Sequence, residues 1–307
     1  MPSVIFAQID PDRIPAKYLF SVGGTSSEQS LLRPEQIRFD SRNREFYIAD
    51  TGNDRIVILN NNGQPVFDFP VSPALHSPID MAVDSDGRIY VLGSSTEGKS
   101  IQVFDYNGRH LRPFEFQGSP SVQPSDIKNI TIDSDNHLFV LDEDGKRILS
   151  FSSNGELRYE FPILEQLDKK SREEEVLGNL SLYGDMFYIP ASSIGSIYCY
   201  NKKGSFLRMI GNKGGAFGEL SFPVAVSEDE ARNIFVLDKH RHTVISFDGT
   251  GKVRGEFGGR GISAGWFYYP ISMVIDSMNR MWVAQVFQNS VQAFSLPEPD
   301  YYLAEKK

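Results

Sequence analysis

The sequence contains a single cysteine, Cys199, among its 307 residues. One thiol cannot form a disulfide within the chain, and it excludes iron–sulfur and metal sites that need several cysteine ligands from one chain. Cys199 lies in the apolar run at residues 197–200, which is typical of a covered strand. We therefore predict a buried thiol with a structural role.

Long apolar runs and an excess of positive charge are also missing. No stretch of about 18 apolar residues is present, so the sequence predicts no membrane-spanning helix. Asp and Glu outnumber Lys and Arg by 40 to 31, and the resulting net charge of -9 disfavours general attraction to the phosphates of nucleic acids. We therefore expect a partner other than nucleic acid.

The first residues allow two interpretations. Residues 4–7, Val-Ile-Phe-Ala, resemble the end of a secretory signal peptide, but a basic segment and a full apolar segment do not precede them. They are either a signal-peptide remnant or part of an N-terminal extension. The first interpretation favours a periplasmic or extracellular protein, and the second a cytoplasmic one.

The sequence is rich in turn-forming residues and repeats one pattern. Its 26 glycines and 17 prolines, with 12% aromatic residues, indicate a turn-rich β protein. The run PEQIRFD at residues 34–40 is followed by YIAD at 47–50, and the same order returns along the chain. Six copies are recognised by an aromatic residue every 43 to 49 positions, and the copy at Tyr188 lacks the Asp: Tyr47, Tyr90, Phe139, Tyr188, Phe235 and Trp282.

Each copy predicts four short strands joined by tight turns. Asn-Gly between apolar runs, as at residues 62–63, 107–108 and 154–155, is a strong hairpin signal. Six such units predict an all-β, six-bladed β-propeller. Residues 17–24 resemble residues 251–259, so we expect the N-terminal strand to complete and close the last blade. The predicted domains are an extension at 1–16, the propeller at 17–296 and a tail at 297–307.

The assembled repeat resembles the NHL type of six-bladed propeller over residues 17–294. The copies PEQIRFDSRNREFYIADTGNDRIVILNNNGQPVFDF and FPVAVSEDEARNIFVLDKHRHTVISFDGTGKVRGEFGGRG carry the resemblance, with the Asp-Thr-Gly-Asn-x-Arg-Ile segment at 50–56 the most specific part. The resemblance implies a protein-docking platform, an RNA-binding module or an extracellular sensor. Less often, such propellers are metal-dependent lyases or lactone hydrolases.

The loops between the second and third strands should gather at one end of the ring, together with the linkers between blades. Binding residues of propellers commonly lie on such loops. Asp50 recurs as Asp142 and Asp238, and a residue that recurs in several blades indicates a structural role, because an active site should occur once. The predicted partner-binding candidates of this end are Asn53, Asp54, Arg55, Lys99, Lys146, Arg147, Lys239, His240, Arg241 and His242.

Metal ligands are the weakest part of the pattern. His240 and His242 are two residues apart, so on an extended segment both imidazoles could reach one Zn²⁺. In NHL-like lyases histidines of several blades hold the metal. Only His242 matches at the corresponding positions here, and the other positions carry Arg55, Ser100, Arg147, Ser196 and Ser290. Lactonase-like propellers use an inward Glu and several Asn, for which Glu35, Asn129 and Asn179 are weak candidates.

Three functions are therefore consistent with the sequence. The first, which we favour, is a non-enzymatic scaffold that binds a protein partner through its loops or blade edges and needs no cofactor. The second is a metal-dependent lyase or lactone hydrolase with one Zn or Ca ion in the central channel. The third is RNA binding through the basic residues of the fifth copy.

Overall fold

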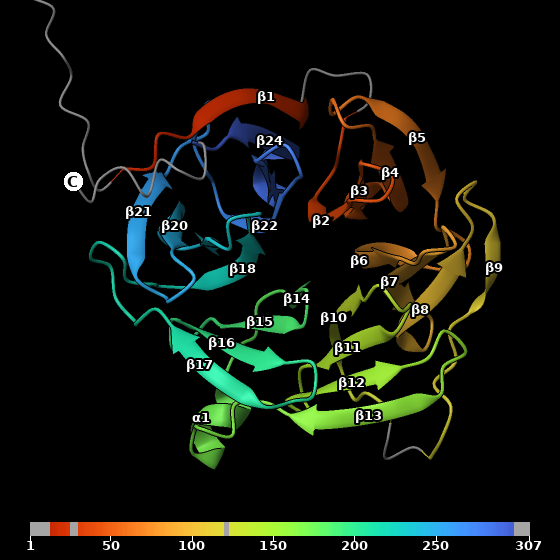
Figure 1. Ribbon diagram of the computed structural model, residues 1–307. Coiled ribbons are helices and arrows are strands. Elements are labelled where there is room, and N and C mark those ends of the chain that lie inside the picture. Colours follow the sequence, from red (N-terminus) through yellow and green to blue (C-terminus); the bar gives the residue numbers. More distant parts are fainter. Residues whose placement is uncertain (1–12, 25–29, 120–122, 298–307) are drawn as a thin grey trace, which may run out of the picture.

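Six four-stranded antiparallel sheets stand in a ring in the computed structural model (Figure 1), which describes residues 13–24, 30–119 and 123–297. Each sheet is one blade, with its first strand at the axis and its fourth strand at the rim. The chain is a six-bladed β-propeller. The fold predicted from the repeat is therefore confirmed.

The blades follow one another in chain order. Blade 1 contains β2 (Pro34–Asp40), β3 (Glu45–Asp50), β4 (Arg55–Leu59) and β5 (Pro65–Pro70). Blade 2 contains β6 (His76–Val83), β7 (Ile89–Ser95), β8 (Gly98–Phe104) and β9 (His110–Pro113). Blade 3 contains β10 (Ile127–Ile132), β11 (Leu138–Asp142), β12 (Arg147–Phe151) and β13 (Leu157–Pro162). Blade 4 contains β14 (Ser181–Tyr183), β15 (Met186–Ala191), β16 (Ser196–Asn201) and β17 (Phe206–Ile210); blade 5 contains β18 (Pro223–Glu228), β19 (Ile234–Asp238), β20 (Thr243–Phe247) and β21 (Val253–Gly258).

Blade 6 is built from both ends of the chain. Its first three strands are β22 (Pro270–Ile275), β23 (Arg280–Gln285) and β24 (Ser290–Ser295), and its fourth is β1 (Lys17–Gly23). β1 pairs antiparallel with β24, from Lys17 opposite Ser295 to Gly23 opposite Ser290. The predicted closure by the N-terminal strand is therefore confirmed. Ile14, which precedes β1, is buried and its amide donates to Glu256 O of blade 5 at 2.9 Å.

Hydrophobic side chains fill the space between neighbouring blades. The six repeat aromatics lie on the second strands and are at most 2% exposed. One cluster of buried side chains lies at each of the six blade junctions, for example Tyr47 and Ile58 of blade 1 with Met81 and Val91 of blade 2. Cys199 is fully buried on β16, and burial raises the pKa of its thiol to about 11. The predicted burial of the thiol is therefore confirmed.

In five of the six blades, an Asp at the end of the innermost strand shapes the turn to the second strand. Asp84 Oδ1 accepts the amides of Asp86 and Arg88 at 2.9 and 2.8 Å, and Asp133 and Asp276 make the same pair of bonds in their own turns. Such side-chain-to-backbone bonds are typical of Asp in turns. The fourth copy lacks this Asp because β14 and β15 are joined by the two-residue turn Gly184–Asp185.

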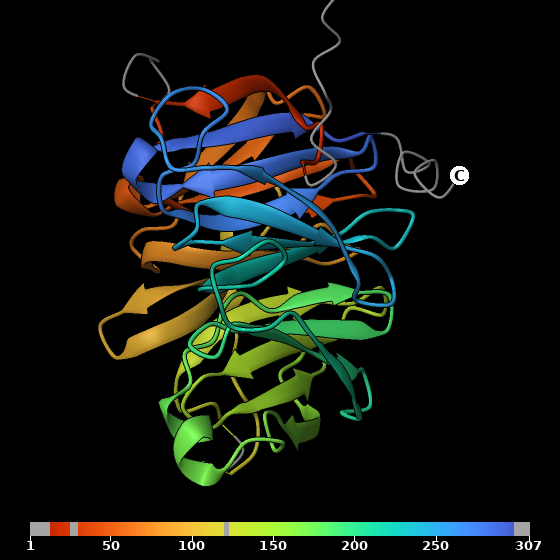
Figure 2. The ribbon, with the colours of Figure 1, turned by 90° about the vertical axis from the view of Figure 1, so that its left-hand side faces the viewer.

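The two ends of the ring are built differently. The loops between second and third strands and the linkers between blades form one end, which we call the loop face; the turns between first and second strands form the other, which we call the turn face. The short helix α1 (Lys169–Glu174), capped by Asp168, belongs to the linker from blade 3 to blade 4 and projects at the loop face in the side view (Figure 2). In the described part of the chain, no helix has the length and apolar character needed to cross a membrane.

Candidate functional sites at the two ends of the ring

The loop of blade 1 is held together by its own charged residues. Asp50 is fully buried; its Oδ1 accepts the Leu32 amide at 2.6 Å, and its Oδ2 accepts Asn53 Nδ2 at 2.8 Å and Arg55 Nε at 2.7 Å. Asp54 Oδ1 accepts the Ser77 amide at the start of β6 at 2.6 Å, and its backbone carbonyl accepts the Val71 amide of the next linker at 2.9 Å. These three candidates, Asn53, Asp54 and Arg55, therefore bind the loop to the linkers on either side of it.

Gly52 is needed for its small size. The residue of this loop with a left-handed backbone is its neighbour Asp54, at φ 52°. A Cβ on Gly52 would lie 2.5 Å from Leu32 Cγ and 2.8 Å from Leu32 O. Glycine is therefore needed because the linker lies directly against the loop.

Blade 3 repeats this arrangement. Asp142 is fully buried, and Arg147 Nε donates to its Oδ2 at 2.9 Å. Burial acts to raise the pKa of Asp142, but hydrogen bonds from the Asp126 amide and Arg147 outweigh it and hold the pKa below its usual value. Lys146 is 8% exposed and donates through Nζ to Glu175 O at 2.7 Å, whereas Lys99 of blade 2 pairs with Asp126 at 2.7 Å.

The basic loop of blade 5 is also largely engaged. Asp238 accepts the amides of His240 and Arg241 at 3.1 and 2.9 Å. Arg241 forms a two-point ion pair with Glu256, at 2.9 and 2.7 Å, and is therefore fixed along the blade. The Lys239 amide donates to Phe222 O at 3.0 Å, and its side chain has no ion pair among the described residues.

His240 and His242 do not lie on the extended segment that the zinc prediction assumed. They belong to the turn before β20, and His242 has a left-handed backbone at φ 57°. His240 is exposed and stacks on Phe222 with ring centroids 4.4 Å apart. His242 is 5% exposed, and its Nδ1 accepts the Tyr269 amide at 3.1 Å. Burial, with Arg260 and His240 nearby, lowers the pKa of His242, so its imidazole is neutral.

Next to His242 lies a group of side chains that the sequence did not single out, which we call the aromatic patch: Arg260, Tyr268, Tyr269 and Phe287. Tyr268, Tyr269 and Phe287 contact one another edge to face at 5.1 to 6.1 Å between centroids. The Arg260 guanidinium lies over the Tyr268 ring at 5.8 Å. These rings come from the linker between blades 5 and 6 and from the η3 loop of blade 6 (Val286–Gln288).

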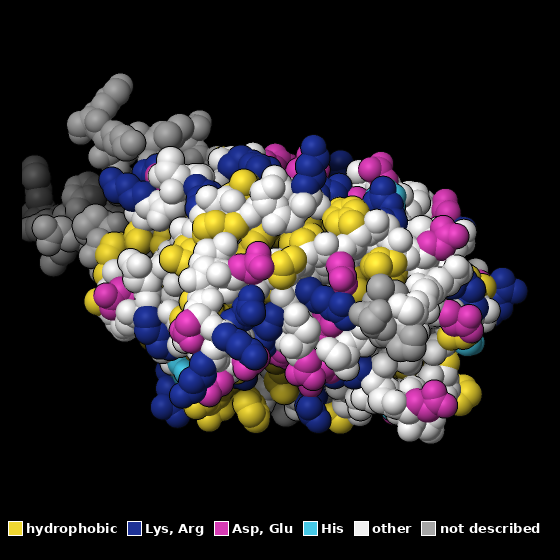
Figure 3. Space-filling view, turned by 90° about the horizontal axis from the view of Figure 1, so that it is seen from below, with side chains coloured by type: hydrophobic (Ala, Val, Ile, Leu, Met, Phe, Trp, Pro, Cys, Tyr) yellow, Lys and Arg dark blue, Asp and Glu magenta, His cyan; other side chains and the backbone are white. Residues whose placement is uncertain are grey.

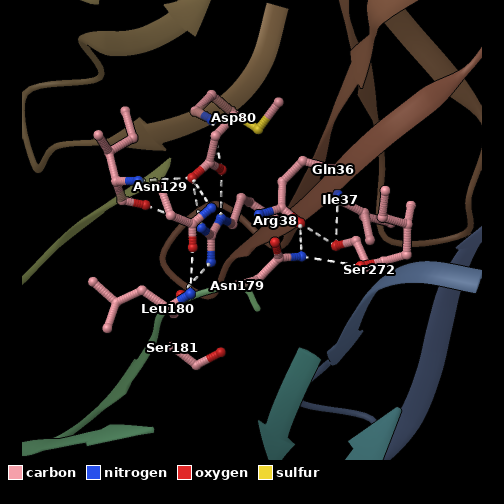
Figure 4. Close-up of polar contacts among 12 residues, drawn as sticks. Gln36, Ile37, Arg38, Asp80, Asn129, Asn179, Leu180, Ser181 and Ser272 are labelled. Atoms are coloured by element: carbon pink, nitrogen blue, oxygen red, sulfur yellow. Dashed lines mark hydrogen bonds and ion pairs between the residues drawn. The ribbon is translucent and has the colours of Figure 1, made fainter. Parts of the chain in front are cut away.

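Polar side chains span the centre of the ring (Figure 4). Arg38 of blade 1 forms a two-point ion pair with Asp80 of blade 2, at 3.0 and 2.9 Å, and donates to Ile130 O of blade 3 and Leu180 O of blade 4 at 3.0 and 3.4 Å. Blades 1 and 4 are opposite in a ring of six. Arg38 therefore lies across the axis.

The weak calcium candidates lie around this arginine. Asn129 Nδ2 donates to Asp80 at 2.5 Å, and its Oδ1 accepts the Leu180 amide. Asn179 Nδ2 donates to Gln36 Oε1 at 3.3 Å, whereas Glu35 pairs with Arg33 away from this network. The Asp80 carboxylate and the carbonyls of Ile130 and Leu180 already accept hydrogen bonds from Arg38, and Asn129 Oδ1 accepts the Leu180 amide. Because a cation there would also meet the Arg38 guanidinium, these residues, arranged in this way, do not fit a metal ion.

One further group of candidate metal ligands lies in the turn of blade 3. Asp133, Asp135 and His137 place their ligand atoms within 4.8 Å of one another. His137 Nδ1 and Lys202 Nζ lie 3.1 and 2.9 Å from Asp133 Oδ2. A lysine ammonium therefore already neutralises the buried carboxylate of this group.

A cavity opens at the turn face, which sequence reasoning did not predict. It has a volume of about 670 Å³ and is lined by residues of all six blades. Arg38 lies at its inner end, and the apolar residues Phe39, Ile132, Leu182 and Val274 line its wall and are partly exposed. Such a volume falls in the range of small-molecule sites.

Comparisons with known proteins show the fold alone. A virginiamycin B lyase from Staphylococcus aureus matches with a TM-score of 0.58 and 14% identity, covering 92% of this chain and 100% of that one. A Bacteroides thetaiotaomicron protein of unknown function matches with a TM-score of 0.63 and 16% identity, covering 89% of this chain and 72% of that one. Hydrazine synthase from Kuenenia stuttgartiensis matches with a TM-score of 0.61 and 12% identity, covering 91% of this chain and 99% of that one. No protein-family model and no curated protein sequence matches the chain.

Proposed function

We propose that this propeller is a non-enzymatic scaffold that binds a protein partner on the loop face, at blades 5 and 6. The observation that carries the proposal is the exposed aromatic patch beside basic residues. It lies on the predicted face, but on residues next to the predicted candidates.

The charged residues of the loop face support binding more than catalysis. Asp50, Asp142 and Asp238 are fully buried and accept several hydrogen bonds each, and Arg55, Arg147 and Arg241 are paired with carboxylates. A general acid needs a proton-donating atom, and a general base a proton-accepting atom, directed at a substrate. Among the described residues of this face, we find no converging set of such groups.

Large apolar side chains are exposed in the same sector. Phe287 is 67% exposed, and Ile262 and Trp266 of the adjoining linker are 78% and 47% exposed. Exposed groups of apolar side chains mark interaction sites, and Tyr, Trp and Arg are the side chains that contribute most at protein interfaces. The mutual contacts of Tyr268, Tyr269 and Phe287 hold the rings in place, so little side-chain entropy remains to be lost on binding.

Local charge indicates the chemistry of the partner. Arg260 and Lys239 have no ion pair among the described residues of this sector, although the whole chain carries a charge of -9. By contrast, acidic and basic side chains are interspersed on the side of the ring seen in Figure 3, with hydrophobic groups scattered between them. We infer a protein segment that presents an apolar side chain together with acidic residues.

The test compares proteins captured from the native host by three baits. These are the wild type, Phe287→Ser, and the control Leu207→Ser, which removes a 46% exposed side chain from the outer strand β17. We expect a partner that the wild type and Leu207→Ser retain and Phe287→Ser loses. The purified partner should bind in calorimetry, more weakly to Arg260→Gln and more weakly at high salt.

Three outcomes contradict the proposal. Equal capture by wild type and Phe287→Ser would place the interaction elsewhere. Capture that ribonuclease abolishes would support the RNA-binding alternative. Substrate turnover by the purified protein with a stoichiometric, tightly held Zn²⁺ or Ca²⁺ would support the lyase or lactone hydrolase alternative.

Two finer expectations remain proposals. Membership of the NHL-repeat family rests on the segment from Asp50 to Ile56 and its partial copies. A periplasmic or extracellular location rests on residues 4–7, which lie outside the described residues, as does the tail from residue 298. N-terminal sequencing of the native protein tests the location, and an intact Met1 would argue against export through signal-peptide cleavage.

A further inference from the structure

We propose that the turn-face cavity is a second binding site, for a small organic cation with an apolar body. This site is separate from the proposed docking surface, because Arg38 and its partners lie across the axis between the cavity and the loop face. The two proposals can therefore fail independently.

One position near the end of the innermost strand of each blade shows that the cavity wall is not the same in all blades. In every blade this residue pairs with the one that precedes the buried repeat aromatic: Phe39, Val83, Ile132, Leu182, Glu228 and Ile275. Five of the six are apolar, and Glu228 of blade 5 is the exception. All six line the cavity.

Blade 5 makes one side of the cavity acidic. Glu228 is followed by Asp229 and Glu230, and all three line the cavity. Glu228 pairs with Arg232 at 2.7 Å and accepts the Tyr188 hydroxyl at 2.6 Å, and burial raises its pKa. Asp229 is bonded to Asn233 but has no ion pair among the described residues, and neither has the exposed Glu230. Two carboxylates therefore remain without a cation.

The other blades supply apolar wall and hydroxyl groups. Phe39, Ile132, Leu182 and Val274 come from blades 1, 3, 4 and 6 and remain partly exposed inside the cavity, so a ligand with an apolar body would remove their surfaces from water. Exposed serines follow the turn Asp in four blades and line the mouth: Ser41, Ser85, Ser134 and Ser277. Hydroxyl and carboxylate oxygens both accept hydrogen bonds from an ammonium group.

The cavity therefore favours an amine over a neutral or acidic molecule of the same shape. The apolar body lies against the wall residues, and the ammonium group lies at the mouth against the exposed Glu230, beside the charge of the buried Asp229. Three arginines also line the cavity, but each is paired with a carboxylate: Arg38 with Asp80, Arg42 with Asp40 and Arg232 with Glu228. A phosphate or carboxylate ligand would therefore meet the uncompensated charge of Asp229 and Glu230.

Three indole probes of matched shape test this: tryptamine, the neutral tryptophol and the anionic indole-3-propionate, titrated into the full chain by calorimetry or NMR. We expect tryptamine to bind with a Kd of about 1 mM or below, and the others more weakly in that order. Glu230→Gln should weaken tryptamine about three- to five-fold and leave tryptophol nearly unchanged. Leu182→Asn should weaken all three.

Matched controls identify the location. Glu97→Gln removes an exposed carboxylate from a loop-face loop, and Leu111→Asn polarises an exposed leucine on the outer strand β9; neither should change binding. A melting temperature for each variant shows that it is folded. Absence of tryptamine binding, equal binding of the three probes, or binding unaffected by both Glu230→Gln and Leu182→Asn would overturn the proposal.

Discussion

The two ends of the ring use their acidic residues in different ways. On the loop face, the fully buried Asp50 and Asp238 bind amides of the preceding linkers, which places the carboxylates inside the scaffold. On the turn face, the repeated Asp binds its own turn, and the next residue projects into solvent, as Glu230 does. The comparison shows that the repeated carboxylates serve the fold at both ends. Glu230 is an acidic residue where four other blades have serine, and it remains available for a ligand.

Removing Arg38, which lies across the axis between the two ends, should have the largest effect on stability. Arg38→Met keeps most of the side-chain volume but leaves Asp80, whose side chain is 1% exposed, without its cation. We expect a loss of about 3 kcal/mol in the free energy of unfolding, measured with urea. Arg33→Met, which breaks the exposed pair with Glu35, is the control and should cost less than about 1 kcal/mol. Equal losses would show that the axial network does not stabilise the ring.

A smaller effect should follow from separating the loop of blade 1 from its linker. Gly52→Ala places a methyl group 2.5 Å from Leu32 Cγ, so the linker must move, at a cost of about 1–3 kcal/mol in unfolding free energy. Gly215→Ala is the matched control, because a Cβ there meets no atom within 4 Å. A wild-type urea midpoint for Gly52→Ala would mean that the linker is not held against this loop.

Acidification should loosen the loop face through His242. Its pKa is lowered from 6.5 in the folded protein, so below about pH 6.5 the unfolded chain binds a proton that the folded protein does not, and stability falls. The raised pKa values of Glu175 and Glu228 act in the opposite direction, because they increase stability as the pH falls. The effect of His242 is therefore measured as the difference in unfolding free energy between wild type and His242→Asn. We expect the stability advantage of wild type over His242→Asn to shrink between pH 7.5 and 5.5. A constant difference would contradict the assignment of a neutral, buried imidazole.

The mouth of the cavity should tolerate substitution best. Glu230 is exposed and makes no ion pair among the described residues, so Glu230→Gln should change the free energy of unfolding by less than about 0.5 kcal/mol. The same urea titrations measure it. A larger loss would assign Glu230 to the scaffold and remove the contrast between the two ends.

The fold could be predicted because the repeat determines it. The buried aromatic recurs in all six copies, the turn Asp in five and the Asn-Gly hairpin in three, so a weak local signal is reinforced by repetition. The pairing of Arg55 with Asp50 also follows from local spacing, since both flank one loop. The need for Gly52 did not follow, because Leu32 approaches it from a separate segment.

The two candidate binding sites were harder to find for the same reason. Tyr268 and Phe287 belong to a linker and to a different loop, and only the ring brings them together. The cavity combines one short segment from every blade. The sequence does contain one signal of the cavity. When the equivalent positions of the six innermost strands are compared, Glu228 stands where the other five blades have an apolar residue.

The joining of β1 to β24 has a consequence for how the protein is made. The ribosome synthesises β1 before blade 1, and its partner strand β24 follows only after all the strands of blades 1 to 5. Blades 1 to 5 have all their strands before then and can form in order, whereas the ring cannot close until the last blade is complete. Until that moment the hydrophobic faces with which blades 1 and 6 pack against each other are open to water. The nascent chain is then most accessible to chaperones and most prone to aggregate.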